Sequence, residues 1–395
     1  MRENVYRLVY DAPRGLDGKR RLKTTTFHGP KKKAEAELAR LIGQVEKGDY
    51  ADADGMTVRE LFTRYLSTAK PKLAAKTYER YADAVRTHIA PTLGAVKIDK
   101  LSPLHLEEAY AGWMQSGAVR RKGGLSARTV LHYHRLIRKV LGQGVLWKVL
   151  ARNVADAVQP PRPQRREMTS LTAEQLVTLL SVAAKPPSRQ AAVQHGVSCE
   201  PAWYPAILFL ASTGVRRGEC LAVKWDDLDL KAGVVSVRRS LEHTRAGLAF
   251  KSPKNGRPRV VEIPGSMVAA LRRYRANQNE QKLALGKGYK DNGLVFARHD
   301  GEPMNPHAFG DAFRELVKRA GVPRIRLHDL RHTHATLLLQ RGENLKVVSA
   351  RLGHTTVGIT GDLYAHVLPG MDRKAADAFD DLLKVTPDTG TELAC

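Results

Sequence analysis

The segment Pro160-Pro-Arg-Pro-Gln-Arg-Arg166 constrains the fold more than any other stretch of this sequence. Its prolines lack backbone donors and disfavour helix, so a globular domain is not expected to continue through them. We therefore predict a stiff linker over residues 159–168, with separately folded regions on both sides. A chain of 395 residues has room for two or three domains.

The first 55 residues have the pattern of a small α+β module. Val5–Tyr10 alternates at the period of a β-strand, and Arg20–Phe27 is a second, threonine-rich candidate strand. A helix is then expected to open at the consecutive lysines of residues 31–33. These lysines are consistent with contact to DNA and equally with a solvated helix start. We predict a separate domain over residues 1–55.

Residues 56–158 carry the pattern of a helical domain. Thr57-Val-Arg-Glu60 is a capping box, in which both side chains satisfy free backbone donors at a helix start. A second helix is expected to end near Pro91. A later helix from about Ser126 places a basic stripe opposite its apolar stripe. Such a stripe is often just a wet surface, but the net charge of +25 favours contact with DNA. Its members are Arg128, His132, Arg135 and Lys139.

Residues 169–384 mix strand and helix patterns. Val234–Arg238 and Arg259–Ile263 are expected to form strands. Between them, Lys254-Asn-Gly-Arg257 carries an Asn-Gly pair, the strongest short signal of a hairpin turn. We expect a mostly helical mixed α/β domain with a small antiparallel sheet, then a disordered tail over residues 385–395. The whole chain is thus predicted to be multidomain and mainly α. Its helices in this region are predicted at residues 267–279, 306–320 and 327–341.

The net charge of +25 and the pI of about 10.1 predict a polyanionic partner. Nucleic acid is the first candidate, because basic surfaces release counterions from phosphates. An anionic membrane surface is the second, but no run of about 18 apolar residues could span a bilayer. The start of the chain lacks the apolar core of a secretion signal. Cys199, Cys220 and Cys395 lie far apart, which favours a reducing, cytoplasmic location.

Two arginines, two histidines and a tyrosine form the most informative set of polar residues. Arginine offers a planar fork of donors that matches phosphate oxygens. Histidine exchanges protons near neutral pH, and tyrosine can act as a covalent nucleophile. Together these residue types suggest nucleophilic attack on a phosphodiester. The residues are Arg216 in Thr213-Gly-Val-Arg, His328 and Arg331 in His-Asp-Leu-Arg, His354 in Leu-Gly-His, and Tyr364.

Each of these residues also has an ordinary interpretation. A His-x-x-Arg pair by itself is usually chance or core packing, and a lone tyrosine is usually core or surface. Glu219, three residues after Arg216, could hold the guanidinium or form a salt bridge without a function. His332 and His334 stand close to His328, but without a His-Glu-x-x-His motif or a cysteine partner we expect no zinc.

The order of the motifs resembles the tyrosine recombinase family, in particular phage-type integrases. Thr-Gly-x-Arg-x-Gly-Glu, a hairpin lysine, Leu327-His-Asp-Leu-Arg-His-Thr, Leu352-Gly-His and a tyrosine follow one another over most of residues 169–380. The two regions upstream are similar to the arm-type and core-type DNA-binding domains of the longer family members. The resemblance there rests on order and pattern only.

The resemblance implies a role for each residue. Tyr364 would attack the scissile phosphate and form a 3′-phosphotyrosine link. Arg216 and Arg331 would clamp the non-bridging oxygens and stabilise the growing charge. His328 would assist proton transfer at the tyrosine, and His354 would donate a hydrogen bond to the phosphate.

A hairpin lysine would protonate the leaving 5′ oxygen. Lys254, directly before the Asn-Gly turn, is our candidate, and Lys251 is the competitor. The protein–DNA ester would keep the bond energy, so no cofactor, metal or ATP is expected. The sequence contains neither a Walker loop nor a carboxylate cluster.

The expected partners are double-stranded DNA at attachment sites and further copies of the chain in a homo-tetramer on that DNA. A host DNA-bending protein or an excisionase is a further possible partner; no membrane is expected. Two alternatives remain open: a type IB topoisomerase, which resembles the same site, and a DNA-binding protein that no longer cleaves.

Overall fold

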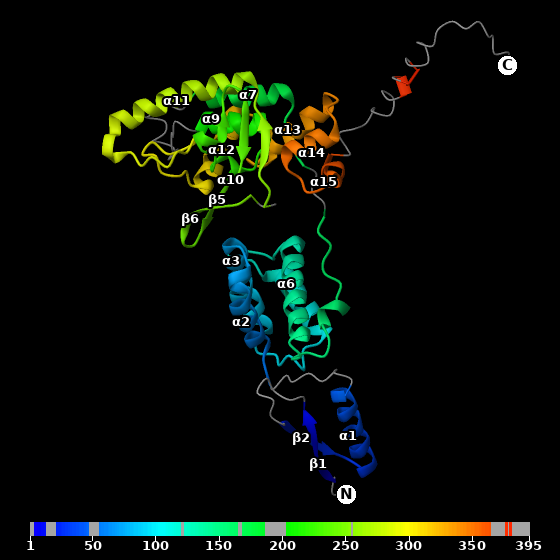
Figure 1. Cartoon of the computed structure of the whole chain (residues 1–395). Helices are drawn as coiled ribbons and strands as arrows, with labels where there is room; N and C mark the ends of the chain where they lie inside the picture. The colour runs from blue at the N-terminus through cyan, green and yellow to red at the C-terminus, as the bar shows by residue number, and fades with distance from the viewer. Residues whose placement is uncertain are drawn as a thin grey trace, which may run out of the picture. The chain divides into compact units, whose positions relative to one another are not determined.

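The computed structural model divides the chain into two compact units, residues 1–166 and 167–395 (Figure 1). Each unit is described by itself. Within the described residues, no helix is long and apolar enough to cross a membrane. The structure describes residues 4–12, 21–46, 55–119, 122–164, 168–185, 203–253, 256–364, 376–377 and 379–380.

The N-terminal part of the first unit is a two-stranded antiparallel sheet with one helix. β1 (Val5–Ala12) pairs along its whole length with β2 (Arg21–His28). α1 (Lys31–Glu46) packs against β1, and Leu8 and Ala34 are buried. This is the predicted α+β arrangement, whereas a domain boundary near residue 55 stays a prediction.

The rest of the first unit is helical, and its first helix begins at the predicted capping box. The Thr57 hydroxyl accepts the backbone N–H of Glu60, and the Glu60 carboxylate accepts the Thr57 backbone N–H at 2.7 Å. Such a cap stabilises a helix start by about 1 kcal/mol. The elements are α2 (Val58–Ala69), η1 (Lys70–Lys72), α3 (Ala75–Ala84), η2 (Val85–Ile89), α4 (Ala90–Leu93), α5 (Pro103–Ser116), α6 (Ala127–Leu146) and η3 (Val154–Ala157).

α6 carries both a core stripe and the predicted basic stripe. Ser126 caps its first turn through the N–H of Thr129. Val130, Ile137 and Val140 are buried in the core of the unit. The opposite side is exposed at each basic position of the stripe, namely Arg128, His132, Arg135 and Lys139.

The second helix ends at Leu93, two residues beyond the expected end near Pro91. The helix runs on from α3 through the π-helical turn η2 into α4, where Pro91 lies in the first turn. In η2 the Ala90 N–H reaches back to the Val85 carbonyl, five residues earlier. A proline ring clashes with the carbonyl of a regular helix turn, and the wider π turn provides room for it.

The second unit is mostly helical, as predicted, and contains two small antiparallel sheets where one was expected. One sheet has the strand order β3-β4-β7, and β5 and β6 form a separate hairpin. α9 is apolar on nearly every side and lies in the core with Phe296, Phe309 and Phe313. The elements are α7 (Ala173–Ala184), α9 (Trp203–Thr213), α10 (Arg217–Cys220), η4 (Trp225–Asp227), β3 (Leu228–Asp229), β4 (Val234–Val237), β5 (Ser240–Thr244), β6 (Gly247–Lys251), β7 (Arg259–Glu262), α11 (Gly265–Leu285), η5 (Gly286–Gly288), α12 (Pro306–Ala320), α13 (Asp329–Gln340), α14 (Leu345–Leu352) and α15 (Val357–Tyr364).

The segment between β4 and β7 contains two strands that the sequence analysis did not predict. β4 and β7 do pair, with Val237 opposite Arg259, but the β5–β6 hairpin lies between them in the sequence. That hairpin turns after Thr244 and brings Lys251 opposite Ser240. The strands on either side of the Asn-Gly segment therefore pair with different partners. The alternation in β5 and β6 is short, which is why the sequence did not reveal them.

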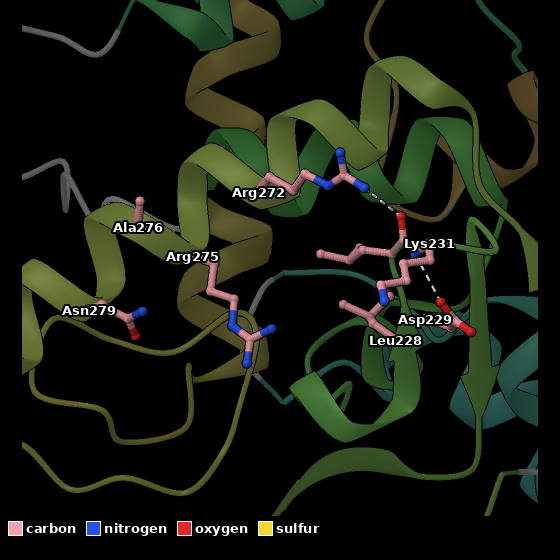
Figure 2. Close-up of a pocket in the computed structure, with 8 residues that line it drawn as sticks. Leu228, Asp229, Lys231, Arg272, Arg275, Ala276 and Asn279 are labelled. Carbon is pink, nitrogen blue, oxygen red and sulfur yellow. Dashed lines mark hydrogen bonds between the residues drawn. The ribbon is translucent and has the colours of Figure 1, made fainter.

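A buried glutamine fastens α11 to the body of the second unit. Gln278 is 2% exposed. Its carbonyl accepts the indole N–H of Trp225 at 2.7 Å, and its amide donates to the carbonyls of Leu294 and Val295. Beside it, a surface hollow of about 760 Å³ lies between α11 and β3, with Lys231, Arg272 and Arg275 around it (Figure 2).

Replacing Gln278 with methionine should destabilise the second unit by about 3 kcal/mol. The volume is kept, but the Trp225 N–H and two carbonyls lose a buried partner. Urea unfolding followed by circular dichroism measures the change. Asn279→Met, one residue on at an exposed position, is the control and should stay within about 0.5 kcal/mol of the parent. Equal stability of the two variants would contradict the role given to Gln278.

Candidate active site

A buried carboxylate organises the upstream part of the site. Arg216 precedes α10, and its backbone N–H and its Nη1 donate to the two oxygens of Glu219, each at 2.9 Å. Arg259, the first residue of β7, donates to the same two oxygens at 2.7 and 3.2 Å. The Glu219 side chain is 1% exposed. Glu219 therefore holds the guanidinium of Arg216, as the sequence suggested. It also binds a second arginine, Arg259, which the sequence did not reveal.

α10 reaches this position because of a glycine. A Cβ at Gly218 would lie 2.6 Å from the Leu241 carbonyl oxygen. Only a residue without a side chain lets this short helix pack so closely against β5. The close packing places Arg216 and Glu219 at the edge where β7 also begins.

Arg331 is the most buried cation of the set. It is 3% exposed, and its Nη1 donates to the Gly214 carbonyl at 2.8 Å. No described residue accepts a hydrogen bond from its Nη2. Burial, then the charge of Arg216, lowers the pKa of Arg331 to about 9, so the guanidinium stays charged at neutral pH. A buried cation with a free donor is stabilised by an anion.

His354 lies beside the two arginines, just after a glycine that ends α14. Gly353 has φ +69°, and a Cβ there would lie 2.8 Å from Arg259 Nε. The ring of His354 is hydrogen bonded through Nδ1 to the Thr360 hydroxyl at 2.7 Å. Burial, then the charges of Arg331 and Arg216, lowers the pKa of His354 to about 4. Either atom can be the donor in this contact; in the tautomer in which Thr360 donates to Nδ1, the ring hydrogen lies on Nε2 and can be donated to a phosphate.

Tyr364, the last residue of α15, is 1% exposed. Its ring packs in an apolar cluster of α13 and α14 that includes Leu339 and Val348. Its hydroxyl is hydrogen bonded to Nδ1 of His332 at 2.7 Å. Burial raises the pKa of Tyr364 to about 12, opposed by the charge of Arg331. The tyrosine is therefore a neutral phenol close to Arg331.

His328 occupies the cap position before α13, and its side chain is exposed. Its ring meets that of His332 edge-on, with centroids 5.3 Å apart. Packing against the protein on one side, then the charges of His332 and Arg331, lowers the pKa of His328 below its usual range. The structure thus brings together Arg216, His328, Arg331, His354 and Tyr364.

The lysine expected in the hairpin lies outside the described residues, since these omit Lys254 and Asn255. Gly256, with φ +65°, donates its N–H to the Pro253 carbonyl at 2.8 Å. Lys251 is described and forms an ion pair with Glu242 across the β5–β6 hairpin. The choice between Lys254 and Lys251 therefore stays a prediction.

Both ring nitrogens of His334 form hydrogen bonds within the protein. Its Nδ1 bonds to the Ala211 carbonyl at 2.8 Å, and its Nε2 accepts from Arg351 at 3.0 Å. Burial, then the charge of Arg351, lowers its pKa to about 4, in agreement with a neutral ring. In the part of the chain that the structure describes, no group of three or more histidine, cysteine, aspartate or glutamate side chains could hold a metal ion.

Two further residues belong to the site, although sequence reasoning assigned no role to either. Arg259 binds Glu219 and also donates to the Arg351 carbonyl at 3.3 Å. His332 binds the tyrosine hydroxyl. The helical spacing could have predicted that His332 is near the site, because it lies four residues after His328 and so shares a helix face with it. Nothing in the sequence separates Arg259 from the other arginines of this basic chain.

Comparison with known proteins decides the family. Residues 169–370, more than half of the chain, match the phage integrase family, and residues 57–114 match the N-terminal SAM-like domain of phage integrases. The chain belongs to the phage integrase family. This confirms the resemblance drawn from the motifs to tyrosine recombinases of the integrase type.

Relatives of similar length support this membership. A tyrosine recombinase XerC-like protein of Caldanaerobacter subterraneus is 26% identical, over 96% of this chain and 97% of the relative. The ICEBs1 integrase of Bacillus subtilis is 25% identical, over 92% of this chain and 93% of the relative.

Solved structures show the same fold. The Tn1549 transposon integrase in complex with circular intermediate DNA has a TM-score of 0.67 at 22% identity, over 82% of this chain and 99% of that chain. A lambda integrase dimer bound to a COC′ core site has a TM-score of 0.54 at 16% identity, over 77% of this chain and 97% of that chain.

Replacing Gly353 with alanine should weaken both the fold and the site. The left-handed φ costs about 1–2 kcal/mol for a residue with a Cβ, and the added atom would displace the Arg259 guanidinium. We expect lower stability in urea and a slower DNA cleavage reaction. Gly361→Ala in α15 is the control, because its Cβ would meet only Leu345 Cδ2 at 3.8 Å. If both alanine variants behave alike, the packing argument for Gly353 is wrong.

Proposed function

We propose that the protein is a site-specific recombinase that cleaves and rejoins DNA through a 3′-phosphotyrosine intermediate and so integrates or excises a mobile element. The observation that carries the proposal is the buried guanidinium of Arg331, with its Nη2 without a partner among the described residues, beside Arg216 and Tyr364. Donors that are buried, charged and already oriented stabilise a phosphate and the charge that grows on it in a displacement reaction.

The chemistry would need only side chains of this chain. Tyr364 would attack the phosphorus while Arg216, Arg331 and the Nε2 hydrogen of His354 bind the non-bridging oxygens. Lys254 would give its proton to the leaving 5′ oxygen. The phosphotyrosine ester keeps the energy of the broken bond, so rejoining by the reverse attack requires neither ATP nor metal. Because Tyr364 is 1% exposed, DNA binding must also uncover its hydroxyl.

Double-stranded DNA is the proposed partner. Phosphates bind basic surfaces by counterion release, and α6 presents its stripe of exposed basic residues to solvent. The names of the similar structures describe integrases in complex with DNA. Exchange between two DNA segments would use four copies of this chain, with a host DNA-bending protein or an excisionase as accessory factors.

The first test is covalent capture on DNA. A nicked suicide substrate of the attachment site should give an adduct that survives denaturation, and Tyr364→Phe should abolish it, because phenylalanine has no nucleophilic oxygen. Gel electrophoresis in denaturant measures the adduct. An adduct formed by Tyr364→Phe would remove the tyrosine from its role. Strand exchange between two sites then separates a recombinase from a type IB topoisomerase.

A sulfur-substituted substrate tests the lysine. With ordinary DNA, Lys254→Ala should slow single-turnover cleavage by about 100-fold or more, since the leaving alkoxide loses its general acid. A bridging 5′-phosphorothiolate leaves as a thiolate and needs no proton, so it should restore most of that rate.

Lys251→Ala is the matched control for this experiment. Lys251 already pairs with Glu242, so its replacement should change cleavage by less than about tenfold on either substrate. If the 5′-phosphorothiolate restored cleavage by Lys251→Ala, and Lys254→Ala were fully active on ordinary DNA, the general acid would be Lys251 and not Lys254.

A further inference from the structure

The hydroxyl of the nucleophile contacts a histidine other than the one that the resemblance assigns to it. Tyr364 Oη lies 2.7 Å from Nδ1 of His332, in a contact that is buried on both sides. His328, the first histidine of the motif, is exposed and meets the ring of His332 edge-on. We propose that His332 positions Tyr364 and accepts its proton during DNA cleavage, an inference that rests on the proposed function.

The direction of the hydrogen bond follows from the surroundings of the phenol. Tyr364 is held in an apolar cluster, where a phenolate would be poorly solvated, so the hydroxyl carries its hydrogen. A buried O–H needs an acceptor, and Nδ1 of His332 is at hydrogen-bond distance. His332 is therefore neutral with its hydrogen on Nε2, which is the form that can take a proton at Nδ1.

The charged groups around His332 determine when it can act. Burial lowers its pKa below the usual range, the carboxylate of Asp329 opposes this, and Arg331 and Arg326 add to it. Among the described residues, the rings of His328 and His354 and the phenol of Tyr364 are further titratable neighbours. His332 is thus unprotonated at neutral pH. Once protonated, its imidazolium would be stabilised by Asp329, one helical turn earlier on α13.

The proposed cleavage is a single displacement at the phosphorus. A bond forms between Tyr364 Oη and the phosphorus, and the bond from the phosphorus to the 5′ oxygen breaks. The phenolic proton passes to Nδ1 of His332, and the 5′ oxygen receives a proton from the general acid, assigned above to Lys254. Rejoining returns both protons. His328 stays in the site as a donor to the phosphate, which suits its exposed position.

The test compares His332→Asn with His328→Asn in the full-length chain. The amide oxygen of asparagine occupies the place of Nδ1, so it can hold the hydroxyl but cannot take its proton. Single-turnover cleavage of suicide DNA is measured from pH 6.5 to 9, together with DNA binding and circular dichroism. Should His332→Asn not fold, His332→Gln replaces it, because glutamine is equally unable to carry the proton.

We expect His332→Asn to cleave about 100-fold more slowly near pH 7, the effect typical of a lost general base. Its rate should rise about tenfold per pH unit, since the phenol, with its pKa of about 12, must then lose its proton to solvent. Wild type and His328→Asn should show no such slope. A 5′-phosphorothiolate should leave the defect of His332→Asn unchanged, because the impaired step is at the nucleophile.

Several results would overturn the proposal. One is wild-type cleavage by His332→Asn, and another is a slow rate without the slope. The slope found in His328→Asn instead would give the role to that histidine. Rescue of His332→Asn by the sulfur substrate would place its defect at the leaving group. The absence of any covalent adduct with the wild-type protein would instead refute the proposed function itself, so the two failures can be told apart.

Discussion

The site depends on one buried carboxylate shared by two guanidinium groups. Glu219 connects the residue before α10 to the first residue of β7, and both arginines reach on to backbone carbonyls around the end of α14. Burial alone raises the pKa of Glu219, but the hydrogen bonds and charges of Arg259 and Arg216 outweigh it and lower the pKa. The stability from this contact is therefore present above the ordinary carboxyl pKa and is lost as the pH falls through the lowered value. Removing either arginine would leave a buried charge with half of its partners.

Three arginines, Arg216, Arg259 and Arg331, lie around this one carboxylate, so positive charge is in excess. Burial and the charge of Arg216 lower the pKa of Arg331. Burial and the charges of Arg331 and Arg216 lower the pKa of His354 and keep its ring neutral. Such mutual repulsion is unfavourable unless an anion enters. A phosphate diester would relieve the repulsion, supply an acceptor for Arg331 and receive a hydrogen from His354. The features that cost stability in the free protein are thus those that would favour the charged transition state of the proposed reaction.

The local signals of the sequence were reliable where they depend on neighbours in the chain. The capping box at Thr57 and the helix start at Ser126 are both formed. Signals that depend on distant partners were weaker. The β5–β6 hairpin was missed because its short strands are stabilised by contacts with α10 and α12. The helix through Pro91 continues because a π turn, which no local pattern announces, makes room for the ring.

The sequence by itself determined the chemistry: which side chains are present, in which order, and that arginines, histidines and a tyrosine in a basic chain suit a phosphodiester. Only the tertiary structure decided which histidine touches the hydroxyl of Tyr364. His328 and His332 are one turn apart and chemically identical. His328 stands before the first residue of α13 and faces outward, whereas His332 lies within the helix on its buried side. That side faces α15 only because α13, α14 and α15 pack around one apolar cluster, a long-range contact that neither helical spacing nor residue type contains.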